Sequence, residues 1–135
     1  MHQSVPRSPG QALIEFTLVL GLLLLLVLGL ISVGQILLAN YTLSQAVRAA
    51  AHQAAIAGGD AEAAQHAARS AIEEGLGVDE TGAEITVSCA APCRRYDPVT
   101  VSIVYRGEFW APLPPLFTEF TVRAAATRAA ERDRQ

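Results

Sequence analysis

Lysine is missing from this chain, and positive charge of any kind is sparse. The basic residues number ten, all of them arginine, against thirteen acidic residues in 135. They are scattered from Arg7 to Arg134 without a cluster, and the formal net charge is −3. Proteins that bind nucleic acid concentrate positive charge on one surface, so this balance argues against a nucleic-acid partner. We interpret the all-arginine usage as genomic base composition.

Familiar catalytic and cofactor-binding patterns are also missing. The sequence has no glycine-rich phosphate loop, no HExxH and no GxSxG. His2, His52 and His66 are not at metal-ligand spacing, and we expect the last two to be exposed or capping residues on helices. We therefore predict that the chain is not an enzyme and that it binds no cofactor and no metal.

Charge is absent from Phe16 through Val47, and this gap contains a long apolar run. From Phe16 to Ala39 the only clearly polar residues are Thr17, Ser32 and Gln35. As a helix the run would be about 36 Å long, enough to cross a hydrocarbon core of about 30 Å. A signal peptide has a shorter apolar core and a small-residue cleavage site close behind it. We favour an uncleaved membrane anchor over a removed signal peptide.

The chain beyond the apolar run keeps a helical period and then changes to a strand period. Apolar residues spaced three, four or seven apart predict that the first helix continues into the soluble part, with this face: Ile36, Leu43, Val47, Ala50 and Ala54. Gly58 and Gly59 interrupt that helix. Asp60 is a favoured N-cap for a second helix with an alanine-rich face, which Gly75 or Gly77 would end.

Three later segments alternate apolar and polar residues, as half-buried strands do. They are EITVSCA, PVTVSIVYR and EFTVRAAATR, and a turn-rich link between the first two predicts a hairpin. The expected fold class is therefore α+β. A long N-terminal transmembrane helix continues into a soluble helix, and a second helix and a small antiparallel sheet of about three strands come after it.

Cys89 and Cys93 are the only cysteines, and they lie in the hairpin link. In an oxidising compartment a disulfide between them would staple the end of the hairpin. Free thiols are the alternative. A metal site would need two further ligands, and no nearby histidine or cysteine supplies them.

Gly10 and Glu15 stand at the start of the apolar run. The stretch GQALIEF, followed by an apolar helix, resembles the processing site of type IV prepilins. The resemblance implies cleavage between Gly10 and Gln11 by a membrane-embedded prepilin peptidase, and assembly roles for Glu15 and Phe16. Glycine suits a peptidase that grips an extended backbone. In the plainer alternative, Glu15 is a carboxylate at the headgroup boundary.

The order of segments along nearly the whole chain resembles the TadE-like pseudopilins, which are minor pilins of the tight-adherence type IV pilus system. The resemblance implies a prepilin-type leader over 1–10, a transmembrane and assembly helix over 11–39, and an extracytoplasmic α+β domain over 40–135. The implied partners are a prepilin peptidase, other pilins or pseudopilins, the inner-membrane assembly platform and membrane lipid. The implied location is the bacterial inner membrane, crossed once, with the N-terminus cytoplasmic.

The link FWAPLPPLF, between the second and third predicted strands, is rich in proline and in large apolar side chains. Prolines keep it from pairing as a strand interior. It either folds back onto the helices or meets a partner, such as a neighbouring pseudopilin or the outer leaflet of the membrane. The residues of this candidate interface are Trp110, Leu113, Leu116 and Phe117.

The sequence is compatible with two functions from different classes. The first is a minor pilin that is processed and contributes to pilus assembly and adhesion. The second is an unprocessed, single-pass membrane protein with an extracytoplasmic structural or binding role. The mature N-terminus distinguishes them.

Overall fold

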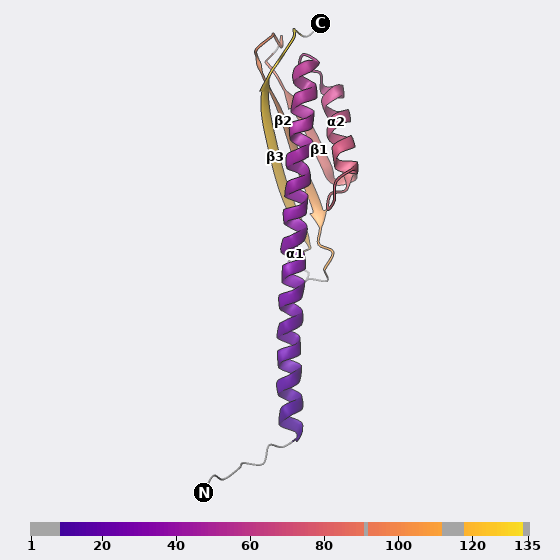
Figure 1. Cartoon of the computed structure of the whole chain (residues 1–135), viewed down its shortest axis with the longest axis vertical. Coiled ribbons are helices and arrows are strands. Elements are labelled where there is room, and N and C mark those ends of the chain that lie inside the picture. Colours follow the sequence, from indigo (N-terminus) through magenta and orange to yellow (C-terminus); the bar gives the residue numbers. More distant parts are fainter. Residues whose placement is uncertain (1–8, 91, 112–117, 134–135) are drawn as a thin grey trace.

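One helix dominates the computed structural model, which describes residues 9–90, 92–111 and 118–133. This helix, α1 (Pro9–Ile56), has 48 residues, and at 1.5 Å per residue it is about 72 Å long. Figure 1 shows that its first half projects alone and that its second half lies against the other elements. Aliphatic and alanine residues, both good helix formers, run through it without a proline after Pro9.

The exposure of α1 changes abruptly near its middle. From Gly10 to Ile31 every residue is exposed except Leu28, which is half-buried, although most of the side chains are large and apolar. Ser32 is the first buried residue, and buried positions then recur along one face to Ala55. We call the exposed half, residues 10–31, the free segment. The remaining described part of the chain, from Ser32 onward, we call the head.

The second helix, α2 (Ala61–Glu73), packs against the second half of α1. Asp60 caps it as the sequence predicts, with its carboxylate accepting a hydrogen bond of 3.2 Å from the backbone N–H of Ala63. Ala64, Ala68 and Ile72 are its buried residues. Alanine lets the two helix backbones approach closely, but it buries little area, so most of the larger side chains of the core come from α1 and the sheet.

A short 3-10 helix, η1 (Glu80–Gly82), leads into three strands, β1 (Ala83–Ser88), β2 (Pro98–Glu108) and β3 (Glu119–Ala129). They form one antiparallel sheet in the order β1-β2-β3. In its register Ile103 of β2 stands between Ile85 of β1 and Ala124 of β3. The outer face is polar, and hydroxyl groups bond across strands, as in Thr100 and Thr127 at 2.8 Å.

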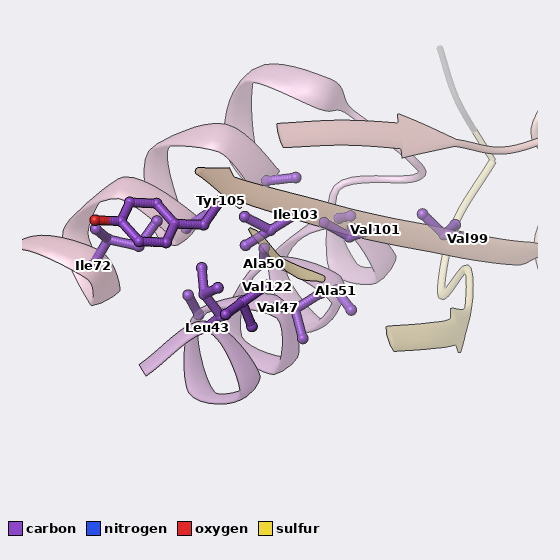
Figure 2. Close-up of a cluster of buried hydrophobic side chains, with 14 of the residues drawn as sticks. Leu43, Val47, Ala50, Ala51, Ile72, Val99, Val101, Ile103, Tyr105 and Val122 are labelled. Atoms are coloured by element: carbon purple, nitrogen blue, oxygen red, sulfur yellow. The ribbon is translucent and has the colours of Figure 1, made fainter. Parts of the chain in front are cut away.

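Both helices cover the same face of the sheet, α1 over β2 and β3 and α2 over the side of β1. The core lies between these two layers. Figure 2 shows it as a row of side chains from β2 facing α1 and α2. The largest fully buried side chains are Leu43, Ile72, Val99, Val101 and Ile103.

The expected α+β fold is confirmed, with a long apolar helix, a second helix and a three-stranded antiparallel sheet. The strand limits differ by one or two residues from the alternating patterns. β1 ends at Ser88, because Cys89 leaves the strand for a disulfide. β2 extends through Gly107 to Glu108, because β3 offers Phe120 and Glu119 as partners there.

Leu43 provides a test of this core. Leu43→Ala should lower the free energy of unfolding of the head by about 2–5 kcal/mol, because it leaves a cavity between α1 and the sheet. Leu37→Ala is the matched control, since Leu37 lies on the same helix but is 63% exposed, while Leu43 is 0% exposed. Chemical unfolding of the full chain in detergent micelles measures both. Equal effects of the two variants would contradict the assigned core.

Candidate functional site

Four polar side chains interrupt the apolar part of α1 between Ala12 and Ala39, and two of them are satisfied within the helix. The hydroxyl of Thr17 donates to the carbonyl of Leu13 at 2.8 Å, and that of Ser32 donates to the carbonyl of Leu28 at 2.9 Å. A hydroxyl that bonds one turn back leaves no unpaired donor toward lipid. These two residues are therefore compatible with a membrane-spanning helix.

Gln35, the third, joins α1 to the C-terminal end of β2. Its side-chain Nε2 donates to the carbonyl of Glu108 at 2.7 Å, and its Oε1 accepts from the backbone N–H of Trp110 at 3.0 Å. Gln35 is only 2% exposed. Both ends of the amide are thus used to hold the start of the β2–β3 link against the helix. The sequence marks this residue only as a polar exception in an apolar run.

Glu15, the fourth, lies in the free segment, close to Gly10, Gln11 and Phe16. All four are exposed, and they occupy the first two turns of α1. A Cβ added at Gly10 would meet no atom within 4 Å. The structure therefore places the predicted processing and assembly residues together, at the end of the molecule farthest from the head.

The bond between Gly10 and Gln11 lies inside the first turn of α1. A peptidase that cut this bond in an extended backbone would have to unwind this turn first. The first four N–H groups of a helix have no carbonyl partner within it, so the first turn is the least costly one to open.

Cys89 and Cys93 form a disulfide at the end of the head that is farther from the free segment. Their Cα atoms are 5.6 Å apart. Cys93 is 3% exposed. The bridge packs on the turn between α1 and α2, where Gly59 has φ +83° and a Cβ on it would lie 2.7 Å from Cys93 Sγ. The disulfide therefore braces the helix turn as well as the hairpin.

The candidate interface in the β2–β3 link is described only at its two ends. Trp110 is 65% exposed. Phe109 turns inward against Phe120, with ring centroids 5.0 Å apart. Leu113, Leu116 and Phe117 lie outside the described residues.

One arrangement that the sequence does not predict lies beside the disulfide. Tyr96 has φ 74°, an uncommon conformation for a large side chain, and its ring is stacked beneath the guanidinium of Arg95. Its N–H donates to the carbonyl of Ala130 at 2.8 Å. Local turn propensity gives no signal for this conformation, because the bond that holds it comes from beyond the end of β3.

The two helical histidines, His52 and His66, are exposed, as expected. Both line an open groove between α1 and α2. Within the described residues, no three histidine, cysteine or carboxylate side chains gather closely enough to hold a metal ion.

The described residues define a class of protein in which one helix, long and apolar enough to span a membrane, carries an α+β head at one end. Residues 10–52 match the family model described as TadE-like protein, which confirms the resemblance to that family along this segment. The match begins at Gly10 and ends in the part of α1 that packs on the sheet. No curated protein and no solved structure matches the chain.

Gly59 provides a test of how the disulfide is seated. Gly59→Ala should destabilise the head by about 1–2 kcal/mol through its left-handed backbone alone, and by more through contact with Cys93 Sγ. In a Cys89→Ala/Cys93→Ala background the contact is removed, so only the backbone part should remain. Gly21→Ala is the control, since its Cβ would meet nothing within 4 Å. Identical losses in the two backgrounds would show that the disulfide does not press on this turn.

Proposed function

We propose that this protein is a minor pilin or pseudopilin of a tight-adherence type IV pilus or a related secretion system. In this proposal a prepilin peptidase cuts between Gly10 and Gln11, and the mature chain takes part in pilus assembly and adhesion. The observation that carries the proposal is the match of residues 10–52 to the TadE-like family model. That segment contains the Gly10 to Phe16 motif at the head of an exposed apolar helix.

The placement of Glu15 supports an assembly role. Cleavage would create an α-amino group on Gln11, one helical turn before Glu15. When free segments of several subunits pack side by side, the amine of one chain can meet Glu15 of another. In so apolar a setting, opposite charges attract strongly, and each relieves the desolvation of the other. The partners proposed here are other pilins or pseudopilins and the inner-membrane assembly platform.

The disulfide supports an extracytoplasmic head. Disulfides persist in oxidising compartments such as the bacterial periplasm, and they are rare in the cytosol. One helix that could span the membrane precedes the head. If the head lies in the periplasm, the start of that helix lies on the cytoplasmic side. We therefore propose the bacterial inner membrane as its location, with incorporation into a filament after processing.

The second candidate function is an unprocessed, single-pass protein with a structural or binding role outside the cytoplasm. The same anchor and the same disulfide favour it equally. The two functions differ in whether the leader is removed and whether the free segment meets other subunits.

Gly10 tests processing. We expect mass spectrometry of membranes to find a mature chain that begins at Gln11, slower cleavage with Gly10→Ala, and none with Gly10→Val. A Cβ at Gly10 contacts nothing in the folded chain, so any loss reports on the peptidase and not on folding. Gly21→Ala should be cut normally. An intact Met1 start in cells with an active peptidase would contradict the pilin proposal.

Glu15 tests assembly. Glu15→Leu should insert in the membrane and be processed, yet lose well over tenfold in crosslinking to partner pilins, because breaking a buried ion pair costs about 3–5 kcal/mol. Thr17→Leu is the matched control, since Thr17 is exposed on the same segment and its hydroxyl is satisfied within the helix. Normal crosslinking and piliation by processed Glu15→Leu would refute the assembly role.

A further inference from the structure

We propose that the head rests directly on the membrane surface, with Trp110 inserted in the lipid–water interface of the leaflet from which the head emerges. In this proposal lipid, and not a second protein, contacts the exposed side chain of Trp110. The inference rests on the proposed function only in that α1 crosses a membrane. It does not depend on processing or assembly.

The position of Trp110 along α1 is fixed by Gln35. The bond of 3.0 Å from the N–H of Trp110 to Gln35 Oε1 holds its backbone at the level of that residue. Gln35 is four residues beyond Ile31, the last residue of the free segment, and four residues of helix are about 6 Å. The backbone of Trp110 therefore lies within about one helical turn of the end of the free segment.

The length of the free segment sets where that point meets the bilayer. Residues 10–31 form about 33 Å of helix, which matches a hydrocarbon core of about 30 Å. If this segment fills the core, the level of Gln35 falls in the headgroup region, which is several ångströms thick on each side. Tryptophan is enriched at that depth, because its ring is apolar and its N–H needs a polar partner.

Beyond α1, the described part of the head has few exposed large apolar side chains. Among the described residues beyond α1, the only large exposed ones are Leu76, Tyr96 and Trp110. Tyr96 is near Ala130, at the far end of the sheet, and the chain there bonds to Ala55 at the end of α1. Trp110 is thus an exposed indole two residues beyond the end of β2, held at the level of Gln35 on α1.

The charges at this end show what kind of contact is expected. Glu108 and Glu119 are direct cross-strand partners at the end of β2 and β3, and both are exposed. Two carboxylates do not attract the anionic headgroups that basic residues bind. The contact should therefore depend on the indole ring, and zwitterionic phosphatidylcholine is a sufficient probe.

Tryptophan fluorescence tests the proposal, because Trp110 is the only tryptophan in the chain. The full-length protein is placed in phosphatidylcholine vesicles that contain lipid spin-labelled either near the headgroup or near the end of the acyl chain. The shallow label should quench Trp110 about twofold more than the deep one, as expected for an interfacial ring. Aqueous iodide should quench it weakly.

The matched control is the double variant Trp110→Phe/Tyr96→Trp, which moves the fluorophore to the far end of the head. Its emission should be quenched by iodide and by neither lipid label. Gln35→Met removes the bonds to Trp110 and Glu108, so the difference between the shallow and deep labels should shrink. Full retention of that difference would overturn the positioning role of Gln35.

The proposal is overturned if Trp110 responds to iodide as the control does, with no quenching by lipid. It is also overturned if its emission shifts to the blue only as the protein-to-lipid ratio rises, again without lipid quenching, because the occupant would then be another protein. Either result leaves the pilin proposal intact if the mature chain begins at Gln11. Conversely, an uncleaved chain with shallow quenching would refute processing while supporting the membrane contact.

Discussion

One uninterrupted helix has to satisfy two surroundings, and the rest of the structure depends on how it does so. The free segment of α1 presents large apolar side chains on every side, as a lipid environment requires. Beyond Ser32 one face of the same helix is buried, and that face consists mainly of alanine with leucine and valine. The sheet and α2 fit that face, because small side chains allow a close approach and β2 supplies the bulk that alanine lacks.

The fold and its long apolar helix were predictable because their signals are local. The apolar run, the cap at Asp60 and the period-two strands each have a signal in neighbouring residues, and the cap and the strands lie close to their expected positions. The point where α1 leaves the free segment was not predictable in this way. In sequence, an apolar helix face that contacts lipid looks the same as one that contacts a protein core. Ile36 and Leu43 therefore could not show where the free segment ends and the head begins.

The sites show the same division. Gly10 and Glu15 could be proposed as site residues from sequence because their spacing is itself the signal. The role of Gln35 could not, because its hydrogen-bond partners lie 73 and 75 residues away. Tyr96 was missed for a related reason, since a bond from beyond β3 holds its unusual backbone. Long-range polar contacts of this kind leave no pattern in a neighbouring window of residues.

The continuity of α1 also fixes how the head is rotated about the axis of that helix. The helix runs without a break from Gly10 to Ile56. Each residue of helix therefore turns the head by about 100° around the helix axis and raises it by about 1.5 Å. A single residue inserted into the free segment would rotate the sheet by about 100° around the helix axis relative to the start of α1. Every contact within the head would stay intact. The number of residues in the free segment therefore sets the direction in which the sheet faces relative to the start of α1.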